Sequence, residues 1–219
     1  MDSTADSIPR SVKFQAPGRP LEPPLLARAR RALLDDLHAH VAAHGLRLEA
    51  GADPDEYSFR RAGSALPWFC DFAETGLKHA VRRLSADLIG GANVTRLDRT
   101  ISHHHPRLPY RRALRIVGGR GWRLALGDDL PAEAQASLVR FCGLLPVQVI
   151  VLPGRPRPAT FAADRQGLAY LLPWAGETIR AELPLPGGPG AGVCRFRIDR
   201  LLQFCLGLAD AAPVRSPAP

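Results

Sequence analysis

The spacing of apolar residues predicts two helices and a short strand in the first third of the chain. From Leu25 to His44, apolar residues recur every three or four positions, which predicts a helix with one apolar face. Residues Leu46 to Glu49 then alternate like a strand, and Ala52-Asp53-Pro54 closes it as a turn. A second helical stretch is expected over residues 66–85.

The middle of the chain carries shorter patterns. Residues 86–98 predict a glycine-broken loop that leads into a short strand, Asn93 to Leu97. After a histidine-rich connector, the spacing of apolar residues predicts a helix from Pro109 to Val117. Another helix is expected from Pro131 to Cys142, because proline is favoured at the first position of a helix.

The last third favours strands. Val147 to Leu152 is a run rich in β-branched residues, typical of a buried strand. Residues 161–182 predict two strands and residues 193–198 a third, followed by a helix from Leu201 to Leu208. The elements do not alternate regularly between strand and helix. We therefore expect an α+β fold, with an antiparallel or mixed sheet and helices on one side.

The length and the distribution of proline indicate a single domain with two tails. Residues 1–24 are Pro-rich and expected to be disordered, residues 25–210 to form the domain, and residues 211–219 to be a flexible tail. The longest apolar runs are too short to span a membrane, and the first ten residues lack the apolar core of a signal peptide. A cytoplasmic protein is expected.

The net charge of +8 leaves two interpretations open. Almost all of the positive charge is arginine, since Lys13 and Lys78 are the two lysines. A basic protein can have an RNA-binding surface. Arginines scattered beside abundant Ala, Pro and Gly instead favour the composition of a GC-rich genome. Arginines that cluster on the folded surface would favour RNA.

The cysteines and histidines give no pattern of a metal site. The cysteines lack C-x-x-C spacing, and Cys70, Cys142 and Cys205 stand among apolar neighbours, which predicts buried thiols. Three adjacent histidines, residues 103–105, are expected to point apart.

Five segments of the C-terminal half carry a more specific signal. They are Pro109 to Ile116, Gly127 to Leu130, Pro146 to Pro153, Leu171 to Glu177, and Arg197 to Leu208. In this order and at this spacing they resemble the catalytic domain of asparaginyl- and aspartyl-type class II aminoacyl-tRNA synthetases. The last segment resembles motif 3 of that family, in which an acid-Arg pair, here Asp199-Arg200, begins a helix.

The N-terminal half resembles the same family more loosely. The helix from Leu25 to His44, the following strand and Pro54 resemble motif 1, which implies a homodimer through residues 25–54. Thr95-Arg96-Leu97-Asp98 resembles motif 2, although Thr95 stands where the family has an aromatic residue.

The resemblance implies that ATP, Mg²⁺ and a small amino acid are bound and an aminoacyl-adenylate formed. By resemblance, Arg96 would hold the α-phosphate and the carboxylate, Arg200 the far phosphates, and Glu177 a magnesium ion that bridges phosphates. Asp98 and Asp199, the acids of motifs 2 and 3, are expected at the nucleotide as well. Arginine suits this task because its planar fork binds carboxylate and phosphate bidentately.

Several residues depart from the family pattern. Arg195 and Arg197 occupy positions where the family has glycines, and long side chains there would fill the adenine site. Little room is left for the motif 2 hairpin after Asp98. A Pro-rich arm replaces the anticodon-binding barrel, so tRNA is possible as a partner but complete tRNA charging is not expected. Asp128-Asp129 is expected to cap a helix rather than to form a ligand pair.

Three functions therefore stay open. Glu177 and Arg200 favour a paralogue that binds ATP and activates a small amino acid as its adenylate. Arg195 and Arg197 favour a non-catalytic, dimeric binding or regulatory subunit. A basic RNA-associated protein is the third possibility, and the distribution of arginines on the folded surface distinguishes it from the other two.

Overall fold

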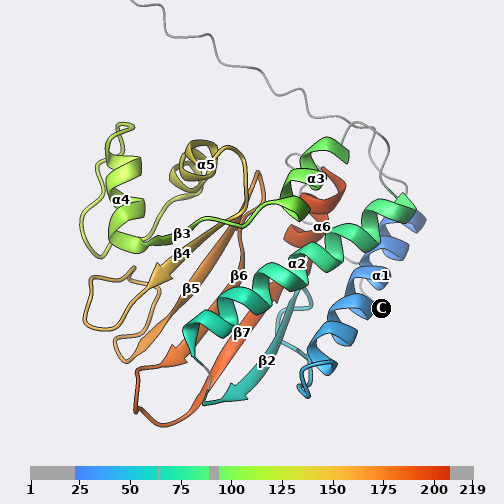
Figure 1. The fold of residues 1–219 in the computed structure, drawn as a ribbon, viewed down its shortest axis with the longest axis horizontal. Helices are drawn as coiled ribbons and strands as arrows, with labels where there is room; N and C mark the ends of the chain where they lie inside the picture. Colours follow the sequence, from blue (N-terminus) through green and yellow to red (C-terminus); the bar gives the residue numbers. More distant parts are fainter. Residues whose placement is uncertain (1–22, 64, 89–93, 208–219) are drawn as a thin grey trace, which may run out of the picture.

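A computed structural model describes residues 23–63, 65–88 and 94–207 (Figure 1). Its helices are α1 (Pro23–Ala42), α2 (Leu66–Leu88), α3 (Val94–Ser102), α4 (Tyr110–Gly118), α5 (Ala132–Phe141) and α6 (Ile198–Leu206). Its strands are β1 (Glu49–Ala50), β2 (Glu56–Ala62), β3 (Arg107–Pro109), β4 (Val147–Val151), β5 (Arg165–Leu172), β6 (Gly176–Pro184) and β7 (Ala191–Arg197). The arm and tail predicted from the sequence lie outside the described residues, except that Pro23 and Pro24 begin α1.

The described strands form one seven-stranded sheet in the order β1-β2-β7-β6-β5-β4-β3. Neighbouring strands are antiparallel, apart from β3 and β4, which are parallel. The sheet is therefore mixed, and the α+β prediction is confirmed. The predicted helices around residues 25–44, 66–85, 109–117 and 131–142 and the strands of the last third are confirmed too.

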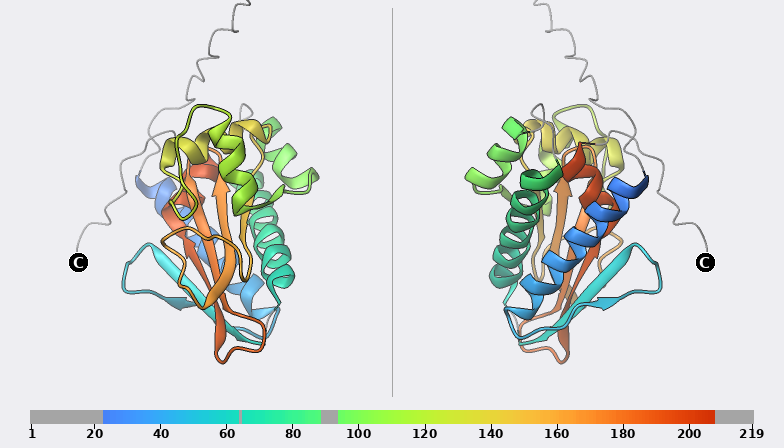
Figure 2. Two further views of the ribbon diagram at one scale, coloured as in Figure 1. Left: turned by 90° about the vertical axis from the view of Figure 1, so that its left-hand side faces the viewer. Right: turned by 90° about the vertical axis from the view of Figure 1, so that its right-hand side faces the viewer.

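Helices cover both faces of the sheet, which corrects the prediction of helices on one side (Figure 2). Strand β5 shows this by its alternation. Leu168 and Tyr170 belong to the core beneath α1, α2 and α6, whereas Ala169 and Leu171 belong to the core beneath α4 and α5. Because strands such as β4 are buried on both faces, a helical layer is needed on each side.

Three local expectations differ from the structure. A strand was expected from Asn93 to Leu97; Asn93 lies outside the described residues, and Val94 to Leu97 lie in α3, which buries Leu97 against the first core, so tertiary packing overrides a weak local pattern. Strand β2 was not predicted at all, although it alternates as a strand should around the fully buried Phe59. The strand predicted at Leu46 to Glu49 is reduced to Glu49–Ala50.

Two glycines allow the strands to pack closely. A Cβ atom on Gly167 would lie 1.9 Å from the carbonyl oxygen of Ala181, and one on Gly192 would lie 2.7 Å from the ring of Phe69. None of the cysteines is in a disulfide. Cys70, Cys194 and Cys205 are buried, whereas Cys142, which was expected to be buried, is half-buried. No helix among the described residues is long and apolar enough to cross a membrane.

Candidate functional site

The start of β6 and the start of α6 bring two of the predicted site residues together. Gly176 adopts a left-handed backbone conformation (φ 66°) as β6 begins, and Glu177 follows it. Nη1 of Arg200, on α6, donates a hydrogen bond of 2.7 Å to the carbonyl oxygen of Glu177. Burial and the nearby charge of Arg197 lower the pKa of Arg200. Arg200, which the resemblance matches to motif 3, therefore contacts the Gly176-Glu177 segment.

The carboxylate of Glu177 is already occupied by a neighbouring cation. Arg180 grips it with two hydrogen bonds, Nε to Oε1 at 2.6 Å and Nη2 to Oε2 at 2.9 Å. The guanidinium of Arg180 also lies over the ring of Phe161, 4.8 Å from its centroid. Burial opposes the charge of Arg180, but its hydrogen bonds to Glu177 outweigh burial and raise its pKa. Glu177 would have to release Arg180 before it could bind Mg²⁺.

Ion pairs continue from this point across the outer face of β6, β7 and β2. Glu182 lies 3.8 Å from Nη1 of Arg180 and 3.4 Å from Nη1 of Arg195. On its other side, Arg195 lies 3.7 Å from Glu56. We call the series Glu56, Arg195, Glu182, Arg180 and Glu177 the charge ladder. Positive and negative side chains alternate along it, and Arg195, on β7, lies between Glu56 and Glu182.

Asp199 faces a different neighbour from the one expected. Its backbone N–H donates a short hydrogen bond to the carboxylate of Asp55, and its own carboxylate lies 3.5 Å from Nη1 of Arg30 on α1. Burial, reinforced by the charge of Asp199, raises the pKa of Asp55 to about 6. Asp55 lies one residue beyond the turn predicted from sequence, and no sequence signal singles it out. It holds the first turn of α6 in place.

Arg96 and Asp98, matched to motif 2 by the resemblance, lie on α3, which packs against α2, and not on the strand that the sequence predicted. Asp98 is exposed, and its carbonyl oxygen accepts a hydrogen bond from the Ser102 hydroxyl. No hydrogen bond or ion pair in the described structure joins the Asp98 carboxylate to Glu177 or Arg200.

A small cavity of about 140 Å³ lies between α5 and the outer face of β4–β6. Its polar lining comes from Asp129, Gln135, Thr160, Glu177 and Arg180, and its apolar lining includes Phe161 and Leu171. Asp129 accepts hydrogen bonds from the backbone and the hydroxyl of Thr160. Gln135 accepts one from the backbone of Glu177.

Neither acid of the Asp128-Asp129 pair caps α5, so the predicted role as a helix cap is wrong. The N-cap residue is Pro131, without a side-chain cap. Asp128 instead closes its own turn by accepting from the Ala125 backbone, and its carbonyl accepts from the Tyr110 hydroxyl at 2.5 Å. This turn leaves Asp129 at the cavity.

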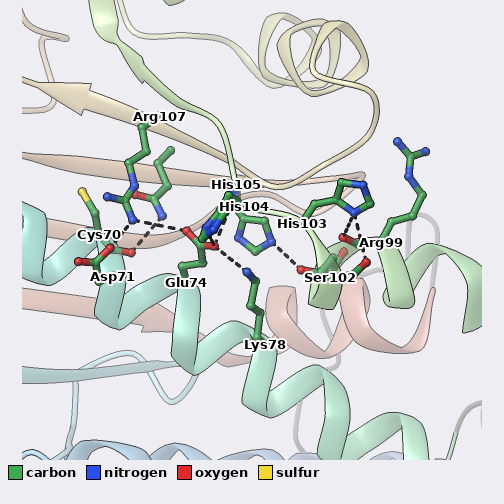
Figure 3. A network of polar contacts seen from close by, with 12 residues as sticks. Cys70, Asp71, Glu74, Lys78, Arg99, Ser102, His103, His104, His105 and Arg107 are labelled. Atoms are coloured by element: carbon green, nitrogen blue, oxygen red, sulfur yellow. Dashed lines mark hydrogen bonds and ion pairs between the residues drawn. The ribbon is translucent and has the colours of Figure 1, made fainter.

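A second polar centre is buried between α2 and the sheet (Figure 3). Glu74 accepts a 2.7 Å hydrogen bond from Lys78 and lies 3.5 Å from Nη2 of Arg107. His105 lies next to it, and its Nε2 is 2.8 Å from the carbonyl oxygen of Thr100. Its Nδ1 makes a short hydrogen bond with the Tyr170 hydroxyl.

The protonation of this centre follows from burial. Burial lowers the pKa of His105 to about 4 and raises the pKa of Tyr170 well above its usual value. His105 is therefore neutral at pH 7, donates from Nε2 to Thr100 and accepts from the Tyr170 hydroxyl. Sequence reasoning expected the three histidines to point apart: His103 and His104 are exposed and His105 is buried. Among the described residues, no group of three or more His, Cys, Asp and Glu side chains could hold a metal ion.

Comparison with solved structures shows that the fold of this chain is similar to that of aminoacyl-tRNA synthetases. The asparaginyl-tRNA synthetase of Pyrococcus horikoshii superposes with a TM-score of 0.64 at 15% identity, over 88% of this chain and 68% of that one. Its complex with asparaginyl-adenylate gives 0.62 at 14% identity, over 84% and 66%. The aspartyl-tRNA synthetase of Entamoeba histolytica gives 0.61 at 8% identity, over 84% and 56%.

These neighbours define the class of fold. The mixed sheet flanked by helices is the fold of a class II aminoacyl-tRNA synthetase catalytic domain. The chain spans 56–68% of the length of these three neighbours. No protein-family model matches it, and no curated protein matches it in sequence. At identities of 8–15% the likeness shows the fold alone, and the activity has to be inferred from the residues of the site.

Proposed function

We propose that this domain binds a small amino acid in the cavity beside α5 and does not activate it, so that it acts as a synthetase-like binding or regulatory subunit. The observation that carries the proposal is the charge ladder, in which Arg195 joins Glu56 and Glu182 across the face of β7. This is the surface on which the family resemblance expects ATP.

The cavity suits a small zwitterion. One cation, Arg180, and two carboxylates, Asp129 and Glu177, line it together with the amide of Gln135. Such a set complements the carboxylate and the ammonium group of an amino acid. At about 140 Å³ the cavity is smaller than the roughly 300–1,000 Å³ typical of sites for drug-sized ligands. The structural neighbour solved with asparaginyl-adenylate supports an amino acid of this size.

The charge ladder disfavours ATP binding because its acids repel phosphate and its side chains fill the space, and not because its ion pairs are strong. Its side chains are 18–37% exposed, so each ion pair contributes on the order of 0–1 kcal/mol. However, if Arg195 turned toward a phosphate, Glu56 and Glu182 would remain on the same face and would repel the anion. The side chain of Arg195 also covers strand β7, where the family has glycine.

Isothermal titration calorimetry on the purified chain tests the proposal. Aspartate and asparagine are titrated with and without ATP and Mg²⁺, and MgATP is titrated alone. We expect an amino acid to bind without ATP and MgATP to give no heat at millimolar concentration. Arg180→Gln should abolish amino-acid binding. Arg165→Gln, a partly exposed arginine on the neighbouring strand β5, should leave it unchanged. Absence of amino-acid binding by the wild type overturns the proposal.

Adenylate formation is the second candidate, and the contact between Arg200 and Glu177 favours it. In that case MgATP binds at micromolar concentration and its binding tightens when aspartate or asparagine is present. The same titrations therefore distinguish the two functions, because the first candidate requires an amino acid alone and the second requires the nucleotide.

Pairing of two copies through residues 25–54 forms part of the same proposal and rests on the resemblance to motif 1. Light scattering after size-exclusion chromatography tests it, with a mass of about twice 23.7 kDa expected. A monomer at tens of micromolar concentration would contradict the dimer but not amino-acid binding.

A further inference from the structure

Exposed arginines gather on α4 and the turn that follows it. Arg111, Arg112 and Arg115 form the outer face of α4, opposite its buried residues. Arg120 and Arg123 follow in the turn and are exposed as well. We call these five residues the arginine patch.

The members of the arginine patch have no carboxylate partner among the ion pairs of the described structure. The stretch from Arg99 to Gly127 contains seven arginines and no Asp or Glu. Arg165, Arg180 and Arg195 each lie within 4 Å of an acid, whereas no ion pair in the described structure involves a member of the arginine patch.

The nearest acids along the chain are engaged elsewhere. The carboxylate of Asp128 accepts from the Ala125 backbone, and that of Asp129 accepts from Thr160. Glu133 lies in the first turn of α5, away from its C-terminal end. The positive charge of the arginine patch therefore stays uncompensated.

An exposed aromatic ring adjoins these charges. Phe141, the last residue of α5, is 52% exposed, and the guanidinium of Arg120 lies 5.3 Å from its ring centroid. Cys142 follows Phe141 in the chain; burial raises the pKa of its thiol, and the nearby charge of Arg112 acts in the opposite direction. The arginine patch is thus continuous with the C-terminal end of α5. Cations beside an exposed aromatic ring are the combination with which proteins bind unpaired nucleic-acid strands, because phosphates meet the charges and bases stack on the ring.

We propose that the arginine patch and Phe141 bind a single-stranded nucleic acid. Arginine forks bind the phosphates, and Phe141 offers a face on which an unpaired base stacks. A base within a duplex is already stacked, so Phe141 favours a single strand over a duplex. The amino-acid cavity lies at the start of α5 and the arginine patch at its end, so the two sites are independent.

Fluorescence anisotropy with a labelled oligouridylate of about 15 nucleotides and the full chain tests the proposal. Five phosphate contacts predict a slope of log K against log salt of roughly −3.5, so affinity should fall about 100-fold between 50 and 200 mM salt. The triple variant Arg112→Gln, Arg115→Gln, Arg120→Gln should reduce the slope to roughly −1.4 and weaken binding at 50 mM salt by at least 10-fold.

Two controls make the experiment specific. The triple variant Arg60→Gln, Arg83→Gln, Arg155→Gln removes the same total charge from exposed positions on β2, on α2 and after β4, and it should leave affinity within about 2-fold of the wild type. Phe141→Ala should weaken single-strand binding roughly 10-fold and leave duplex binding unchanged. Equal losses in the two triple variants would show attraction by net charge alone and would overturn the assignment. Equal affinity for single strand and duplex would overturn the role of Phe141.

Discussion

Replacing His105 with glutamine should change how the stability of the domain depends on pH. The imidazole is 3% exposed, and the charge of Lys78 adds to burial in disfavouring its protonated form. Both ring nitrogens are engaged, one by Thr100 and the other by Tyr170. A proton on Nδ1 would break the bond from Tyr170, whose hydroxyl is buried and retains its own proton.

The sign and size of the effect follow from the pKa of His105. Its usual value of 6.5 falls to about 4 in the folded chain. Below pH 6.5 the unfolded chain therefore takes up a proton that the native state refuses. The contribution of neutral His105 to stability is complete above pH 6.5 and is lost as the pH falls toward 4. The full loss is about 3 kcal/mol, of which about 2 kcal/mol is lost by pH 5.

Two carboxyl groups with shifted pKa values limit the pH range in which the effect of His105 can be measured. The pKa of Asp55 is raised from 3.8 to about 6, so the native state holds a proton that the unfolded chain has released, and stability falls as the pH rises through this range. This trend opposes that of His105. The pKa of Glu74 is lowered, so its contribution is lost below 4.5. A comparison of variants between pH 5 and 7.5 therefore isolates His105 better than the wild-type curve alone.

Urea unfolding followed by circular dichroism provides the assay. The free energy of unfolding is measured at half-unit steps for the wild type, His105→Gln and the control His103→Gln, whose ring is exposed. From pH 7 to pH 5 the wild type should lose about 2 kcal/mol relative to His105→Gln and nothing relative to His103→Gln. Parallel curves for the wild type and His105→Gln would refute the reasoning, whatever their vertical offset.

Three further changes test the rest of the fold and the site. Gly167→Ala should destabilise the domain by about 1–3 kcal/mol or more in urea unfolding, because the added methyl group meets the Ala181 carbonyl at 1.9 Å; Gly118→Ala, which meets nothing within 4 Å, should not. The double variant Arg195→Gly, Arg197→Gly, combined with Glu56→Gln and Glu182→Gln so that these two acids no longer repel phosphate, should gain MgATP binding in calorimetry. Unchanged binding would show that occlusion and repulsion are not what closes the nucleotide face. Asp55→Asn should raise stability at pH 7–8 and flatten the pH dependence between 4 and 6, because it removes a carboxylate that is hard to ionise; a loss of stability at pH 7 would contradict this.

The sequence by itself determined most of the elements and the order of the family-like segments. Helix α1 and strand β4 were predictable because their apolar spacing is local and does not depend on what covers them. The link between Glu177 and Arg200 could be expected from the resemblance, and the structure brings them together. The strength of these signals lies in long periodic segments, where burial alone selects the conformation.

Only the tertiary structure decided which partners these residues have. Periodicity shows that a side chain is buried or exposed, but strand register sets which side chains meet, and it placed Arg195 between the acids of the two neighbouring strands, Glu56 and Glu182. The same holds for α3, where packing of Leu97 outweighed a weak local pattern, and for His105, the buried member of three adjacent histidines. Charge is long-ranged and depends on position in space, so the arginine patch becomes distinct from scattered arginine only when α4 and the end of α5 lie side by side.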